Sequence, residues 1–300
     1  MRASGIDTGA RKDSRTSTLG RGGKVLVRAL GVETTVSELV RYRQLWLSLT
    51  WRDLRVRYKQ SVLGIAWAVL LPLSMMLVFT FVFTRAIDAR AVLGVRMPYA
   101  LYAYTGLVPW TFFSVSLGGC VNSLVANRNL VTKVHFPREV FPLSCVAGAF
   151  VDFCIAIVVL VGLVAYFHLT GSWSFSPTAA LWFLPVVVVV QIALTVGLGM
   201  LLAMANLFYR DVRQVFGVAI QLWMFISAVV VPVPTDGTLL ARLISINPLV
   251  PIVNGYRDCV IHGQLPAMGP LVYATVVAAA ALIGGWVCFR RASFRFAECI

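Results

Sequence analysis

The chain has 300 residues, of which 59% are apolar and only 13% are charged, whereas a soluble domain carries about 25% charged residues. This composition, with a mean hydropathy of +0.83, excludes a water-soluble enzyme, a disordered regulator and a coiled coil, and it indicates an all-α integral membrane protein. The formal net charge is +14. The basic residues gather near the start of the chain and between apolar segments, which is typical of a topology signal and not of nucleic-acid binding.

Residues 1–35 are basic and contain no apolar segment, so we expect a flexible cytoplasmic tail and no cleavable signal peptide. Residues 36–60 follow a helical period with one polar and one apolar arc. This pattern predicts an amphipathic helix in the inner membrane interface. A cytoplasmic helix packed on a partner is the alternative. The residues expected to hold this helix at the interface and to meet lipid headgroups are Arg41, Gln44, Trp46, Trp51, Arg52 and Arg55.

Six further segments are apolar and long enough to cross a hydrocarbon core, which takes roughly 20 residues of helix. They are residues 62–84, 99–121, 140–168, 179–205, 214–231 and 268–289. Six spans place both termini on one membrane side. Basic residues are about fourfold more numerous in the segments on that side, so we expect both termini in the cytoplasm.

The region between the fifth and sixth predicted spans, residues 236–262, contains short apolar stretches interrupted by Asn247-Pro248 and Arg257-Asp258. Each stretch is too short to cross the membrane and too apolar for a free loop. Two short re-entrant helices in the outer leaflet would explain both facts, because irregular backbone at membrane depth must be buried in protein. A folded outer cap is the alternative.

The sequence offers no catalytic centre. The six cysteines lack metal-ligand spacing and the three histidines are far apart, so we expect neither a catalytic residue nor a metal site. The glycine-rich residues 19–25 do not form a phosphate loop, which would need Gly in place of Thr18 and Ser or Thr in place of Val25. Asp152 is the one carboxylate well inside a predicted span, and it is either a packing residue or part of a transport path.

Aromatic side chains are frequent in the predicted spans. Their rings could pack on the C–H faces of a sugar chain in a translocation path, although Trp and Tyr also gather at membrane interfaces as ordinary anchors. The candidate path residues are Trp67, Tyr104, Trp110, Phe112, Trp223 and Phe225.

Several stretches carry a family signature. RYKQSVLG at residues 57–64, followed by Ile65-Ala66-Trp67 and Pro72, resembles the entry to the first span of the ABC-2 type permeases that export polysaccharides. NLVTKV at residues 129–134 and FPRE at residues 136–139 are similar to that family's loop between spans two and three. NLFYRDV at residues 206–212 and NPL at residues 247–249 are similar to later family segments.

The resemblance implies a homodimeric permease that pairs with two separate ATP-binding subunits and moves a lipid-linked polysaccharide, such as O-antigen, capsule or teichoic acid, across the bacterial inner membrane. ATP and Mg would bind the partner subunits, and this chain would bind no cofactor. Residues 36–60 would be a gate helix at the inner entrance. A secondary carrier or channel, or a membrane-embedded transferase, is the alternative. The residues expected to couple to the ATPase are Asn127, Arg128, Lys133, Phe136, Pro137, Arg138, Arg210 and Asp211.

Overall fold

The computed structural model describes residues 42–59, 63–64, 66–86, 97–133, 137–175, 177–230, 239–293 and 296. The chain divides into two units, residues 1–43 and residues 44–300, and nearly everything described belongs to the second. The predicted tail and two predicted site residues, Arg41 and Phe136, lie outside the described residues.

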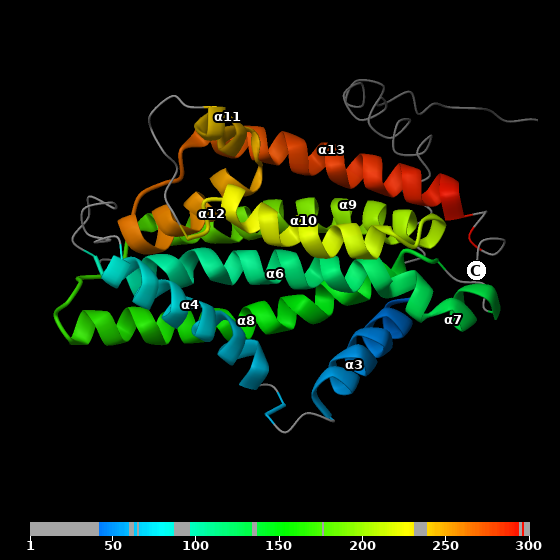
Figure 1. The fold of residues 1–300 in the computed structure, drawn as a ribbon, viewed down its shortest axis with the longest axis horizontal. Helices are drawn as coiled ribbons and strands as arrows, with labels where there is room; N and C mark the ends of the chain where they lie inside the picture. Colours follow the sequence, from blue (N-terminus) through cyan, green and yellow to red (C-terminus); the bar gives the residue numbers. More distant parts are fainter. Residues whose placement is uncertain are drawn as a thin grey trace, which may run out of the picture. The chain divides into compact units, whose positions relative to one another are not determined.

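The second unit is a bundle of helices (Figure 1), and no strand occurs within the described ranges. In chain order the helical elements are α3 (Arg43–Lys59), α4 (Ala66–Ala86), α6 (Tyr99–Ala126), α7 (Arg128–Lys133), α8 (Val140–Leu169), η1 (Ala179–Phe183), α9 (Leu184–Phe208), α10 (Val212–Ile226), α11 (Leu239–Ile246), α12 (Leu249–Arg257), η2 (Asp258–His262) and α13 (Met268–Ser293). The prediction of an all-α membrane protein is confirmed.

Five described helical segments are long and apolar enough to cross a membrane. They are Ala66–Thr84, Tyr99–Ala126, Val140–Leu169, Ala179–Phe208 and Met268–Ser293, and they coincide with predicted spans one to four and six. The fifth predicted span corresponds to α10, which has 15 residues. That length gives a helix of about 22 Å, shorter than a hydrocarbon core of about 30 Å. The count of six spans therefore stays a prediction.

The helix α10 ends at Ile226, before the predicted end of span five, for a reason the structure shows. Ala228 follows in a left-handed conformation, with φ of +51°. The buried Arg257 donates hydrogen bonds to the carbonyl oxygens of Ala228 (2.8 Å) and Val229 (2.5 Å). A helix end without water nearby needs such donors for its open carbonyl groups. The carbonyl oxygen of Ile226 at the helix end accepts from Nδ2 of Asn247 (3.3 Å), and Arg257 of α12 satisfies the two carbonyl groups just beyond it.

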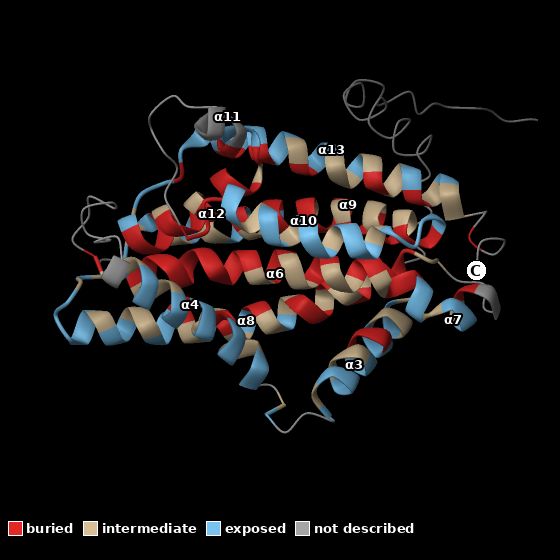
Figure 2. Cartoon of the chain, in the orientation of Figure 1, coloured by how far each residue is buried: buried red, intermediate tan, exposed pale blue. Residues whose placement is uncertain are grey.

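The centre of the bundle is α6, which contacts α4, α8, α9, α10 and α12. Figure 2 shows it as the most continuously buried helix. Pro109 lies inside α6, and its carbonyl oxygen accepts a hydrogen bond from Nε2 of Gln191 on α9 (2.7 Å). The Oε1 atom of Gln191 accepts in turn from the hydroxyl of Tyr256 on α12 (2.6 Å). The buried side-chain amide of Gln191 therefore links α6, α9 and α12.

The helices α11 and α12 lie within the region predicted to be re-entrant. Almost all of α12 is buried, and it packs against α6, α9 and α13. In Figure 1 both helices lie at the end of the bundle opposite α7. Two short apolar helices are therefore present, and their entry into the outer leaflet stays a prediction.

Candidate functional site

The helix α3 corresponds to the described part of the predicted gate helix. Its Leu49 and Thr50 are buried, while Trp51 is 60% exposed. Among the described residues, α3 does not pack along its length against any spanning helix. Besides the two buried side chains, a small number of polar side chains join α3 to the bundle, and each of them contacts a residue far away in the sequence.

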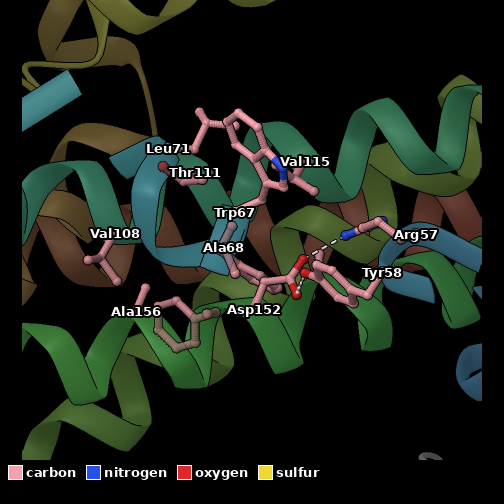
Figure 3. Close-up of a pocket in the computed structure, with 13 residues that line it drawn as sticks. Arg57, Tyr58, Trp67, Ala68, Leu71, Val108, Thr111, Val115, Asp152 and Ala156 are labelled. Atoms are coloured by element: carbon pink, nitrogen blue, oxygen red, sulfur yellow. Dashed lines mark hydrogen bonds and ion pairs between the residues drawn. The ribbon is translucent and has the colours of Figure 1, made fainter. Parts of the chain in front are cut away.

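Two of these contacts are with Asp152, near the middle of α8. Arg57 Nη1 lies 2.6 Å from Asp152 Oδ2, and the Tyr58 hydroxyl donates to Asp152 Oδ1. Figure 3 shows both interactions. Burial, followed by the hydrogen bond to Asp152, raises the pKa of Tyr58 to about 12, so this hydroxyl remains a donor at neutral pH. Both carboxylate oxygens of Asp152 are therefore satisfied by residues of α3.

A second polar contact joins α3 to the end of α6. Arg52 Nη2 donates to Asn127 Oδ1 (2.8 Å) and also pairs with Asp53 of its own helix (2.9 Å). Asn127 is the C-cap residue of α6, and its Nδ2 donates to the carbonyl oxygen of Ser123 (2.8 Å). A residue predicted for headgroup binding and a residue predicted for ATPase coupling are thus in direct contact.

Two hollows lie beside α3, and Arg57 lines both of them. The first has a volume of about 440 Å³ and is the more polar of the two, although apolar groups make up the larger share of its lining. Its polar lining comprises Arg52, Asp53, Arg57, Asn122, Ser123, Asn127 and Ser144. The second has a volume of about 250 Å³ and is mostly apolar, and Trp67, Leu71 and Val115 are among its lining residues. We call the two together the α3 cleft. The cleft therefore has a more polar part and an apolar part, and Arg57 lines both of them.

The other predicted coupling residues lie at the end of the bundle that contains α7. Arg138, just before α8, donates a hydrogen bond to the carbonyl oxygen of Ser293 at the end of α13. Its guanidinium also lies 5.8 Å from the ring centroid of Phe296, which contacts Phe208 of α9 (6.0 Å between centroids). The start of α8 and the ends of α9 and α13 are therefore linked, and Figure 1 shows them at the same end of the bundle as α7.

The remaining members of this set lie nearby in the chain. Arg210 and Asp211 are exposed in the turn between α9 and α10, while Arg128 begins α7 and Pro137 precedes Arg138. The side chain of Lys133 lies outside the described residues. The described members thus leave polar groups accessible at one end of the bundle.

Comparison with known proteins identifies the protein family to which this helical bundle belongs. The family description "ABC-2 type transporter" matches residues 44–261, which is more than half of the chain. The chain belongs to the ABC-2 type transporter family. The resemblance inferred from the motifs is thereby confirmed, and the chain is a multi-pass membrane protein of this family.

Several curated relatives align over most of their length. An O-antigen export system permease protein RfbA of Myxococcus xanthus is 32% identical over 88% of this chain and 98% of its own length. A protein of the same name from Klebsiella pneumoniae is 29% identical, over 83% and 92%. The polysialic acid transport protein KpsM of Escherichia coli is 23% identical, over 80% and 90%.

The structure does not bring the six predicted path residues of this ABC-2 chain together. Only Trp67 and Phe112 line the α3 cleft. Tyr104 and Trp110 are buried within α6, where the Tyr104 hydroxyl donates to the carbonyl oxygen of Ala156 (3.3 Å). The other two path residues lie on α10, where Trp223 is half-buried and Phe225 is exposed. The translocation path stays a prediction.

Sequence reasoning missed several residues that the structure places in the cleft. Asn122 and Ser144 line its polar part, and neither carried a distinguishing signal. Arg57 and Tyr58 appeared only as part of a family motif. A signal for them did exist, because a carboxylate inside a span requires a partner, and Asp152 was recognised as such a group. Within the described ranges, no group of three or more His, Cys, Asp or Glu residues is arranged to hold a metal.

Proposed function

We propose that this chain is the permease subunit of an ATP-driven exporter that moves a lipid-linked polysaccharide across the bacterial inner membrane. The proposal is supported by the family and by the two full-length relatives named for O-antigen export. The chain would act as a homodimer with two ATP-binding subunits that hold ATP and Mg, since its own sequence lacks a phosphate loop. Both termini would lie in the cytoplasm.

The observation that carries the proposal is the two-part character of the α3 cleft. A lipid-linked sugar chain joins a long apolar tail to a diphosphate headgroup. The apolar part of the cleft, beside Trp67 and Leu71, suits such a tail. The polar part contains Arg52 and Arg57, and guanidinium groups bind phosphate oxygens bidentately. We propose that the cleft under the gate helix receives the headgroup end of the lipid before export.

In a competing interpretation, the arginines of α3 only attract anionic lipids and do not recognise a headgroup. Basic residues near a membrane surface attract anionic lipids by about 1 kcal/mol each, without specific geometry. Lysine can replace arginine in that task because it carries the same charge. It cannot replace arginine where a planar pair of donors must match a phosphate group. The two interpretations therefore differ in what an Arg-to-Lys exchange should do.

The first test exploits that difference. Cells that lack the native gene would express the chain with Arg41→Lys and Arg52→Lys, and surface polysaccharide would be measured together with the abundance of the chain in the membrane. We expect export to fall clearly while abundance stays unchanged. The control is Arg242→Lys, because Arg242 is exposed on α11, away from the cleft. Full export by the double variant would remove headgroup recognition from the proposal.

A second experiment separates an ATP-driven exporter from a secondary carrier. Inverted inner-membrane vesicles that contain the whole export system would be supplied with lipid-linked polysaccharide. Uptake should stop when ATP is withdrawn and should persist when a proton ionophore is added. Uptake that depends on the proton gradient and continues without ATP would refute the proposal and support a carrier.

A further inference from the structure

The charge on Asp152 is unusual for its position and is neutralised from outside its own helix. A carboxylate inside a membrane-spanning helix is costly unless it is paired. The Asp152 side chain is only 16% exposed, and its described partners, Arg57 and Tyr58, both belong to α3. Its pairing therefore lasts only while α3 lies against α8.

Apart from its polar contacts, α3 buries the side chains of Leu49 and Thr50, which lie about two helical turns before Arg57. Leu54 approaches α8, with its Cδ2 atom 4.0 Å from the point where a Cβ on Gly148 would lie. Arg52 contacts Asn127 at the end of α6. Between α3 and α4 the chain passes through Gly64, whose φ of +50° is readily adopted only by glycine. The end of α3 that lies next to this glycine turn can change its position if its polar contacts are exchanged.

We propose that Asp152 is a positioning residue that holds the gate helix closed over the cleft, and that an anionic lipid headgroup opens the helix by competing with Asp152 for Arg57. This inference rests on the proposed function, because it takes the headgroup from there. Arg57 lines both parts of the cleft, so it can exchange the carboxylate of Asp152 for a phosphate group. No proton transfer or covalent step is required.

The competition has a physical direction. When α3 moves away without a ligand, Asp152 is left in a span with no described cation beside it, which disfavours the open position. When a diphosphate lipid is present, Arg57 keeps a doubly charged partner in the open position. The pair would therefore keep the gate closed in the absence of cargo and release it in the presence of cargo.

The test measures the position of α3 directly by cross-linking. Leu54→Cys and Gly148→Cys would be introduced together with Cys145→Ser, since Cys145 lies one helical turn from Gly148. Inner-membrane vesicles that contain the complete export system would be oxidised for a fixed time, and the joined peptides would be measured by mass spectrometry. We expect efficient cross-linking. Adding Asp152→Asn should lower the ratio of closed to open gate by about tenfold, which is less than for a fully buried charge pair because the Arg57 side chain is 39% exposed.

Two further variants keep the test decisive. Tyr58→Phe retains the ring and the ion pair, so its effect should fall between those of the parent and Asp152→Asn. It serves in place of Asp152→Asn if that variant does not accumulate. Lys59→Gln removes a cation from the same turn of α3 without touching Asp152, and it should cross-link like the parent. Equal cross-linking in the parent, Asp152→Asn and Tyr58→Phe would overturn the proposal.

The role of the headgroup is tested with a defined probe. The parent cysteine pair would be reconstituted, with its partner subunits, in vesicles that contain an isoprenoid diphosphate or an equal charge of phosphatidylglycerol. The diphosphate should lower cross-linking severalfold and phosphatidylglycerol should not. Equal cross-linking in both vesicles would overturn the competition. Cross-linking is measured without export, so an absence of export in wild-type vesicles would count against the proposed function alone.

Discussion

The contact between α9 and α13 allows a sharp test of packing, because two neighbouring glycines on α13 differ in their surroundings. A Cβ on Gly285 would press into the carbonyl group of Gly197 on α9, with the carbonyl carbon 3.1 Å and the Cα atom 3.2 Å away. A Cβ on Gly284 would meet no heavy atom within 4 Å. Gly285→Ala and Gly284→Ala therefore make the same chemical change in a tight site and in an open one.

The expected free energies have opposite signs. Alanine is favoured over glycine inside a helix by about 1 kcal/mol, so Gly284→Ala should be neutral or slightly stabilising. At Gly285 the same gain is opposed by overpacking, which costs about 1–3 kcal/mol. The opposing atoms belong to backbone, so the helices must separate and lose the van der Waals contacts that hold membrane helices together. We expect the two variants to differ by about 2 kcal/mol.

The assay is reversible unfolding of the purified chain in mixed micelles, with the free energy of unfolding taken from the denaturant dependence. Gly197→Ala provides a check from the other helix, because a Cβ there would lie 2.5 Å from the carbonyl oxygen of Ala281. It should destabilise the chain as Gly285→Ala does. Equal unfolding free energies for the Gly284 and Gly285 variants would refute the close approach of α9 and α13.

Two other predictions concern the ends of the bundle. Arg257→Gln should lower the free energy of unfolding by about 2–3 kcal/mol, because it leaves the carbonyl groups of Ala228 and Val229 without charged donors. The control Arg242→Gln changes an exposed residue of α11 and should have little effect. Equal losses of unfolding free energy in the two variants would contradict the role of Arg257. Lys133→Glu and Arg138→Glu should uncouple ATP hydrolysis from export while the chain remains inserted, because a reversed charge disrupts a polar interface. Co-purification with the ATP-binding subunits and export would both be measured, and normal values in both variants would remove this end from the coupling prediction.

The spans were predictable because length and hydropathy are local properties of the sequence. Each of the five long helices coincides with a predicted apolar segment. The end of α10 was not predictable, since Ala228, Val229 and Val230 continue the apolar pattern of the helix. The donors that permit the break, Asn247 and Arg257, come from beyond α10, at separations of 20 to 29 residues. The hydrophobic pattern of residues 214–231 therefore gives no indication of these two donors.

The candidate site was predictable only in outline. A helical period placed Arg52 and Arg55 on a polar arc of α3, and an isolated carboxylate marked Asp152. Their contacts depend on which arc faces the bundle, and that arc includes Arg57, which is 95 residues from Asp152. A single helix cannot reveal its partner across such a distance. The pairing follows from tertiary packing, which brings the C-terminal end of α3 next to the middle of α8.

The two polar contacts of α3 also suggest how a distant event could reach the cleft. Arg52 is bonded to Asn127, where α6 ends and α7 begins, and α7 belongs to the region proposed to dock the ATP-binding subunit. Arg57, less than two helical turns further along the same helix, is bonded to Asp152 and lines both parts of the cleft. A displacement of α7 on docking or hydrolysis would therefore act on the same helix that the headgroup is proposed to move. Under the proposed mechanism, both influences would act on the Arg57–Asp152 pair, so that cargo and ATP would each weaken the proposed closed position of α3.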